Sequence, residues 1–158
     1  MSQNASADLV FGVPLGGSDE GWLLTGPKDR WGEVRLEAEH LPWLTPAEAE
    51  EFDDLGYGEI LELGLAHLAT LTSPTSGDPL SLGLTVHYHG YELNSFALVL
   101  REPQYNVSWG GTTHVDYQLL RDTRHLGAHH LLFAEAFAAL NLQPEDPEPR
   151  WFMTCEYC

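Results

Sequence analysis

The sequence predicts an α+β domain in which an antiparallel sheet of about four to six strands carries two or three helices packed on one face. Three observations support this fold class. Apolar and polar residues alternate from Leu80 to Tyr88, a Gly110-Gly111 pair separates two further alternating segments, and an apolar arc with helical spacing runs through residues 123–140. Alternation indicates half-buried strands, whereas the 3.6-residue spacing indicates a helix that covers the sheet.

The strands are predicted from short apolar runs bounded by turn residues. The first such runs occupy residues 9–13, 22–25 and 33–37. Four segments are then expected to follow one another as a sheet built within residues 80–119: 80–88, 93–101, 105–109 and 113–119. A last edge strand is expected at 151–157. The face of the sheet toward the helix is expected to carry Leu82, Leu84, Val86, Phe96, Leu98, Val115 and Tyr117.

The helices are predicted from their start signals and their apolar arcs. Thr45 precedes Pro46, and Glu48 stands three residues after the threonine, which is the pattern of a capping box with proline at the first helical position. This helix should end near Asp54, and a second should run over residues 59–71. The helix over residues 123–140 should cover the sheet, with Phe133 and Phe137 buried beneath it.

Length and composition indicate one folded domain over residues 1–158. A chain of 158 residues that is 43% hydrophobic can bury a single core. No run of eighteen apolar residues is present, and the first ten residues lack the pattern of a signal peptide. We therefore expect a cytoplasmic protein.

The charge of the chain is large, negative and segregated. The formal net charge is −17, and the stretch from Leu36 to Leu100 contains eleven acidic residues but no Lys or Arg. Such a field repels phosphate backbones and anionic membranes and attracts basic proteins. Direct binding of nucleic acid or membrane is therefore not expected, and a basic protein partner is.

The candidate partner-binding residues lie in the most acidic part of this stretch. They are Glu48, Glu50, Glu51, Asp53, Asp54, Glu59 and Glu62. A solvated helix usually mixes both signs of charge, so a one-signed surface indicates a non-catalytic interaction module, such as an immunity protein, an antitoxin-like inhibitor or a nucleic-acid mimic. A surface that serves solubility alone is the alternative for the same residues. The sequence does not predict the oligomeric state.

A small metalloprotein, in which histidines bind the ion, is the alternative function. His87 and His89 share one face of a predicted strand, and the polar face of the predicted fourth strand adds His114 and Asp116. His125 and His129 lie one helical turn apart and form a second candidate pair. With eight histidines in the chain, such spacings also arise by chance.

Two further motifs are too incomplete to assign. Residues 87–92, with the sequence HYHGYE, resemble the first metal-binding motif of cupins over six residues, but the preceding glycine of that motif is Ser81 here and its second motif is absent. Cys155 and Cys158 form a C-x-x-C pair without a second pair or a βαβ unit, so a partly exposed pair on an edge strand is expected. No nucleophile elbow or phosphate loop is present, and no catalytic residue or cofactor is predicted.

Overall fold

The computed structural model describes residues 5–157 except 19, 93 and 109. Within this part the chain forms an antiparallel, curled sheet of six strands together with four α-helices, which confirms the predicted α+β class. The strands are β1 (Ala5–Gly17), β2 (Gly21–Trp22), β3 (Leu84–Tyr91), β4 (Ser95–Leu100), β5 (Tyr105–Ser108) and β6 (Arg150–Tyr157). The helices are α1 (Pro46–Glu50), α2 (Tyr57–Leu68), α3 (Tyr117–Arg121) and α4 (Thr123–Leu140), with short 3-10 helices η1 (Ala38–His40) and η2 (Phe52–Asp54).

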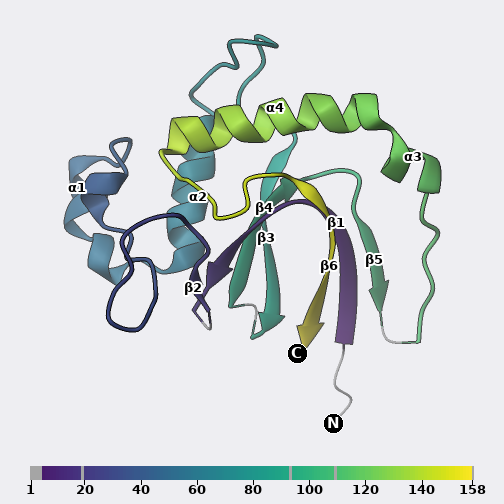
Figure 1. Ribbon diagram of the computed structural model, residues 1–158, viewed down its shortest axis with the longest axis horizontal. Coiled ribbons are helices and arrows are strands. Elements are labelled where there is room, and N and C mark those ends of the chain that lie inside the picture. The colour runs from purple at the N-terminus through teal and green to yellow at the C-terminus, as the bar shows by residue number, and fades with distance from the viewer. Residues whose placement is uncertain (1–4, 19, 93, 109, 158) are drawn as a thin grey trace.

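The long strand β1 organises the sheet. The strand order is β2-β1-β4-β3-β6, with β5 beside β1. Strand β6 pairs with β1 from Ala5↔Tyr157 to Gly12↔Arg150, and its last residues also pair with the end of β3. The sheet therefore curls on itself, and both described ends of the chain lie side by side (Figure 1).

Helix α4 crosses one face of the sheet, and α2 packs beside it (Figure 1). Phe133 of α4 is fully buried between the helix and the sheet, where it meets Phe11 of β1 edge-on. Phe137 of the same helix is also buried, as predicted. The opposite, inner face of the curl holds a smaller apolar cluster of Val10, Ala97 and Val99. Strand β4 is therefore buried on both faces.

The capping signal at Thr45 is confirmed. The Thr45 side chain accepts a hydrogen bond from the Glu48 amide, and the Glu48 carboxylate accepts one from the Thr45 amide, at 3.3 and 2.7 Å between the nitrogen and oxygen atoms. Helix α2 begins earlier than predicted, because Gly56 is its N-cap rather than part of a break. Gly58 lies inside α2, where a Cβ atom would come within 2.9 Å of the Phe96 ring, so a glycine permits the close approach of α2 to the sheet.

The predicted fourth strand at residues 113–119 is wrong. Asp116 instead caps α3, since its carboxylate accepts hydrogen bonds from the amides of Gln118 and Leu119. The capped helix removes the segment from the sheet, so Tyr117 is 74% exposed and Val115 lies outside the core cluster. The local capping bonds outweigh the alternating pattern.

Three further strand predictions need correction. The strand predicted at residues 80–88 is β3, and it begins at Leu84 rather than Leu80. Turns that start at Pro79 and the positive φ of Gly83 interrupt the predicted strand, so Leu82 is 59% exposed instead of facing the helix. The predicted strand at residues 33–37 is reduced to isolated bridges of Val34. Strand β6 is not an edge strand, since it lies beside β1 and touches β3.

Candidate functional site

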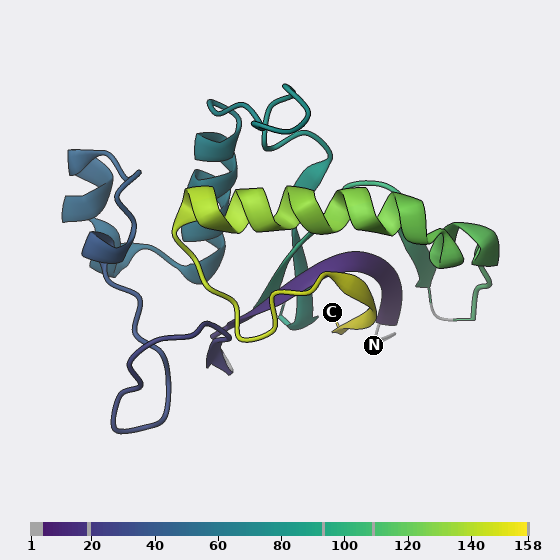
Figure 2. The same cartoon turned by 45° about the horizontal axis from the view of Figure 1, so that its top comes forward.

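The acidic segment lies at the end of the molecule opposite α3, where α1, η2 and α2 gather (Figure 2). We call the seven predicted residues Glu48, Glu50, Glu51, Asp53, Asp54, Glu59 and Glu62 the acidic surface. Six of them are exposed, and Glu48 is half-buried. The fold thus brings residues from three consecutive short elements to one end of the protein.

Two members of the acidic surface also stabilise helix starts. The carboxylate of Glu48 closes the capping box with Thr45, and these hydrogen bonds, first to the backbone and then to the side chain of Thr45, lower the pKa of Glu48. Glu59 accepts a hydrogen bond from the amide of Gly56, with 2.7 Å between the nitrogen and Oε2. Negative charge at a helix start is also favourable to the helix dipole.

The remaining exposed carboxylates between these caps lie outside the ion pairs of the described residues. Among the residues that the structure describes, Glu50, Glu51, Asp53 and Asp54 form no ion pair with Lys or Arg. Three of the seven Lys and Arg residues form ion pairs within the described part of the chain, and all three pair with other carboxylates: Lys28 with Glu145, Arg35 with Glu37 and Arg150 with Asp146. No described ion pair therefore neutralises these four carboxylates.

A shallow hollow of about 370 Å³ lies where α2 meets β3. Its apolar floor is formed by Leu55, Leu63 and Tyr88, and Glu59 and Glu62 line it with carboxylates. The Tyr88 hydroxyl donates a hydrogen bond to Glu62 Oε1 at 2.8 Å. Burial, followed by the contacts with Glu62 and Glu59, raises the pKa of Tyr88 to about 12.

A second hollow of about 290 Å³ adjoins the first, because Leu55 lines both. Its floor includes Tyr57, whose ring lies 4.5 Å from that of Trp22 between centroids. Asp29, Glu33 and Asp53 line it with carboxylates, and Arg35 lines it with a basic side chain. Burial first, and then the charge of Glu33, raises the pKa of Tyr57. The acidic surface therefore borders two hollows with apolar and aromatic lining.

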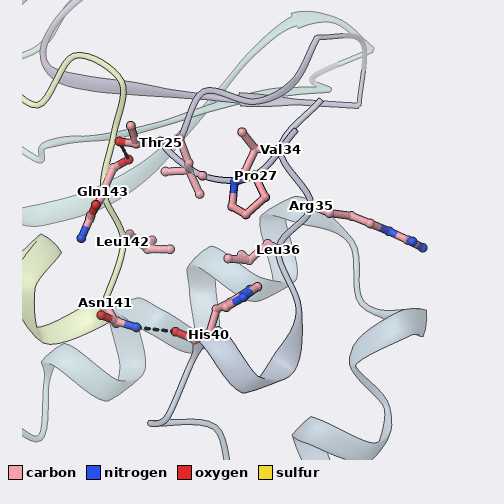
Figure 3. Close-up of a pocket in the computed structure, with 11 residues that line it drawn as sticks. Thr25, Pro27, Val34, Arg35, Leu36, His40, Asn141, Leu142 and Gln143 are labelled. Atoms are coloured by element: carbon pink, nitrogen blue, oxygen red, sulfur yellow. Dashed lines mark hydrogen bonds between the residues drawn. The ribbon is translucent and has the colours of Figure 1, made fainter. Parts of the chain in front are cut away.

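A third hollow, between the 24–36 segment and the chain after α4, is less suited to binding (Figure 3). Its polar groups bond to one another: the Thr25 hydroxyl donates to the Gln143 carbonyl, and the Asn141 amide donates to the His40 carbonyl. Arg35 extends away from the hollow (Figure 3). This hollow therefore presents few free polar groups to a ligand.

The histidine pair of β3 faces the inner side of the curled sheet. His87 Nε2 lies 2.8 Å from the Thr154 hydroxyl oxygen of β6 and 3.8 Å from Asp8 Oδ2 of β1. The rings of His87 and His89 are 5.8 Å apart between centroids. Nε2 of His89 is buried and has no hydrogen-bond partner among the described residues. Burial, and then the neighbouring His87, lowers the pKa of His89 to about 4.

The predicted partners of this histidine pair are not beside it. His114 lies in the loop before α3 and Asp116 caps that helix, because the strand expected to carry them does not form. The structure places Asp8 and Thr154 near His87 instead. Within the ranges described, no group of three His, Cys, Asp or Glu side chains is arranged to hold a metal ion.

The other candidate ligands are only partly described. His129 lies on α4 with its ring 6.1 Å from that of Phe11, whereas the side chain of His125 lies outside the described residues. Cys155 is an exposed free thiol on β6, and Cys158 also lies outside the described residues. The pair of His125 and His129 therefore stays a prediction as metal ligands, and the exposure of Cys155 agrees with the partly exposed pair expected there.

Sequence patterns predicted the carboxylates but missed the apolar residues between them. Tyr88 and Leu63 are half-buried residues of β3 and α2, and they read as core positions by their spacing alone. They line the hollow only because α2 packs against β3, and no local sequence pattern predicts that packing. Asp8 was missed because its proximity to His87 depends on the pairing of β1 with β6.

Comparison of the chain with protein-family models, with curated proteins and with solved structures finds no match. Among the helices that the structure describes, none has both the length and the apolar character needed to cross a membrane.

Proposed function

We propose that this protein is a non-catalytic interaction module whose acidic surface binds a basic protein. The observation that carries the proposal is a set of four exposed carboxylates outside the described ion pairs, Glu50, Glu51, Asp53 and Asp54, beside two hollows with apolar floors. An inhibitor of the immunity or antitoxin kind, or a nucleic-acid mimic, would use such a surface in the cytoplasm. Its partner would be a protein rich in Lys and Arg.

The combination of charge and apolar floor supports binding over solubility alone. Charges at the rim of an interface steer the encounter and exclude partners of the same sign, whereas buried aromatic and aliphatic contacts supply most of the affinity. The acidic surface and the hollows beside it offer both, since Tyr57 shares a hollow with Asp53, and Leu55 and Tyr88 share one with Glu59 and Glu62. A surface that served only solubility would need no such floor.

The proposal is tested by comparing three forms of the chain as bait for proteins of its native host. The first is the wild type. The second carries Glu50→Gln, Glu51→Gln, Asp53→Asn and Asp54→Asn, and it leaves the capping residues Glu48 and Glu59 intact. The third is a matched control with Glu20→Gln, Asp78→Asn, Glu102→Gln and Glu148→Gln, four exposed carboxylates outside the acidic surface. Both variants have a formal charge of −13, four units from −17.

We expect a basic protein to be retained by the wild type and the matched control and lost from the second form, with release by salt. The interaction is then confirmed with the two purified proteins. Equal retention by all three forms would assign binding to another surface, and equal loss from both variants would assign it to net charge alone. Either result contradicts the proposal.

A further inference from the structure

The hollow at Tyr88 has the chemistry of a receptor for one side chain. Three apolar groups, from Leu55, Leu63 and Tyr88, form a floor that suits an aliphatic stem. Two carboxylates, of Glu59 and Glu62, stand at its exposed margin and suit a cation. The long side chains of Lys and Arg carry both features in this order, since they bury their methylene groups and keep the charge in water.

The hydrogen bonds of the hollow fix both carboxylates but leave one oxygen of each available. Oε2 of Glu59 accepts from the Gly56 amide, and Oε1 of Glu62 accepts from the Tyr88 hydroxyl. The other oxygen of each carboxylate has no donor among the described residues. Two oriented acceptors beside a tyrosine ring match a planar guanidinium, which donates several hydrogen bonds in a fixed fork and stacks on aromatic faces. An ammonium lacks that planar match.

We propose that the hollow formed by Leu55, Glu59, Glu62, Leu63 and Tyr88 receives an arginine side chain of the basic partner. This inference rests on the proposed function and names the chemistry by which the partner is anchored. The stem of the arginine lies on the two leucines, and its guanidinium lies at the Tyr88 ring between the two carboxylates. The exposed carboxylates of α1 and η2 then attract the partner without contacting this side chain.

The probe is the peptide acetyl-Gly-Arg-Gly-amide, titrated into the labelled full chain and followed by NMR at the methyl groups of Leu55 and Leu63 and the ring of Tyr88. The same peptide with citrulline is the matched neutral control, since citrulline has nearly the shape of arginine without its charge. A lysine peptide tests the choice of cation. The variant Glu59→Gln with Glu62→Gln removes both charges and keeps one acceptor oxygen in each side chain for the hydrogen bonds from Gly56 and Tyr88. Glu50→Gln with Glu51→Gln is its control for net charge.

We expect the arginine peptide to shift the signals of the hollow in a saturable manner, with weaker effects from lysine and none from citrulline. Removing both charges of the hollow should weaken arginine binding about fivefold or more, whereas the control variant should change it less than about twofold. Dispersed spectra of both variants show that the fold is kept. Equal shifts with citrulline, equal binding of lysine, or unchanged binding by the hollow variant would each overturn the assignment.

This result is separable from that of the proposed function. If a basic protein binds through Glu50, Glu51, Asp53 and Asp54 but the arginine peptide does not enter the hollow, only the arginine assignment fails. If the peptide enters the hollow but no basic protein depends on the acidic surface, the proposed function fails.

Discussion

His89 of β3 occupies a site that disfavours a positive charge on its ring. Its place on β3 is set by alternation, which puts Val86 and Tyr88 toward the helices and His87 and His89 toward the inner face. The ring is half-buried, with Nε2 inaccessible to solvent, and a proton on it would face both desolvation and the charge of the neighbouring His87. The fold therefore favours the neutral form of His89.

The stability of the fold should depend on pH through His89. The pKa of His89 is lowered from 6.5 to about 4 in the fold, so between these values the unfolded chain binds more protons than the folded chain. His89 therefore leaves the free energy of unfolding unaffected above about pH 6.5 and lowers it progressively as the pH falls toward 4. In urea unfolding across this range, His89→Gln should reduce the loss, and the exposed control His114→Gln should not. Equal pH profiles of all three proteins would contradict this assignment.

Glu48 differs from its acidic neighbours because it closes the capping box with Thr45. Replacing it by lysine removes one capping bond and places a cation at the helix start, where the helix dipole opposes it. We expect Glu48→Lys to lower the free energy of unfolding by about 1 kcal/mol. The exposed control Glu50→Lys should change it by less than about 0.5 kcal/mol. Chemical denaturation of both variants measures the difference, and equal losses would remove the capping role.

At the scale of elements, local signals predicted α4 and the start of α1, but they missed the end of α1 at Glu50, both bounds of α2 and the presence of α3. Thr45 and Glu48 marked the start of α1, and the apolar spacing of residues 123–140 gave the full extent of α4. Both signals are formed by residues within one or two turns of each other. The prediction for residues 113–119 failed because two local signals competed there, and the cap at Asp116 prevailed over alternation.

The order of the strands could not be predicted, because it depends on contacts between distant parts of the chain. The pairing of Ala5–Gly12 with Arg150–Tyr157 joins the two ends of the sequence. No sequence pattern within either strand predicts which strand it pairs with. The inner face of the curl, with Asp8, His87 and Thr154, follows from that pairing and was therefore missed as well.

The packing of α4 should dominate the stability of this layer. Phe133 is fully buried and Phe137 is 4% exposed, so truncation of either leaves a cavity between α4 and the sheet. Phe133→Ala and Phe137→Ala should each cost about 3–5 kcal/mol. Leu131→Ala on the same helix, at a position 45% exposed, is the control and should cost much less. Thermal or urea unfolding that shows losses under about 1 kcal/mol at both phenylalanines would exclude α4 from the core.

At the scale of the whole molecule, the sequence predicted where the charge gathers but not what lies beside it. Exposure of Glu50, Glu51, Asp53 and Asp54 follows from their type and their place in short helices. The structural tasks of Glu48 and Glu59 depend on cap geometry, and the two hollows depend on how α2 meets the sheet. Only the folded chain distinguishes carboxylates that hold helices from those that are free to meet a partner.

A one-signed surface opposes the compact state through self-repulsion. The variant Glu50→Gln, Glu51→Gln, Asp53→Asn and Asp54→Asn should therefore have a free energy of unfolding equal to or greater than that of the wild type. Any loss should be less than about 0.5 kcal/mol. The advantage of the variant should shrink as salt screens the charges. Denaturation at low and at physiological salt measures both effects. A clear loss of stability would mean that these carboxylates hold the fold together.

The rate of association between the chain and its basic partner, measured by stopped flow against salt concentration, tests the central claim most directly. Steering by a charged surface raises such rates about 10 to 1,000-fold, and screening beyond about 8 Å at physiological salt removes much of that gain. The account predicts a rate for the wild type that falls steeply as salt rises. The variant neutralised at Glu50, Glu51, Asp53 and Asp54 should associate more slowly and depend less on salt. A rate that is the same for both proteins and indifferent to salt would contradict the claim that the acidic surface binds a partner.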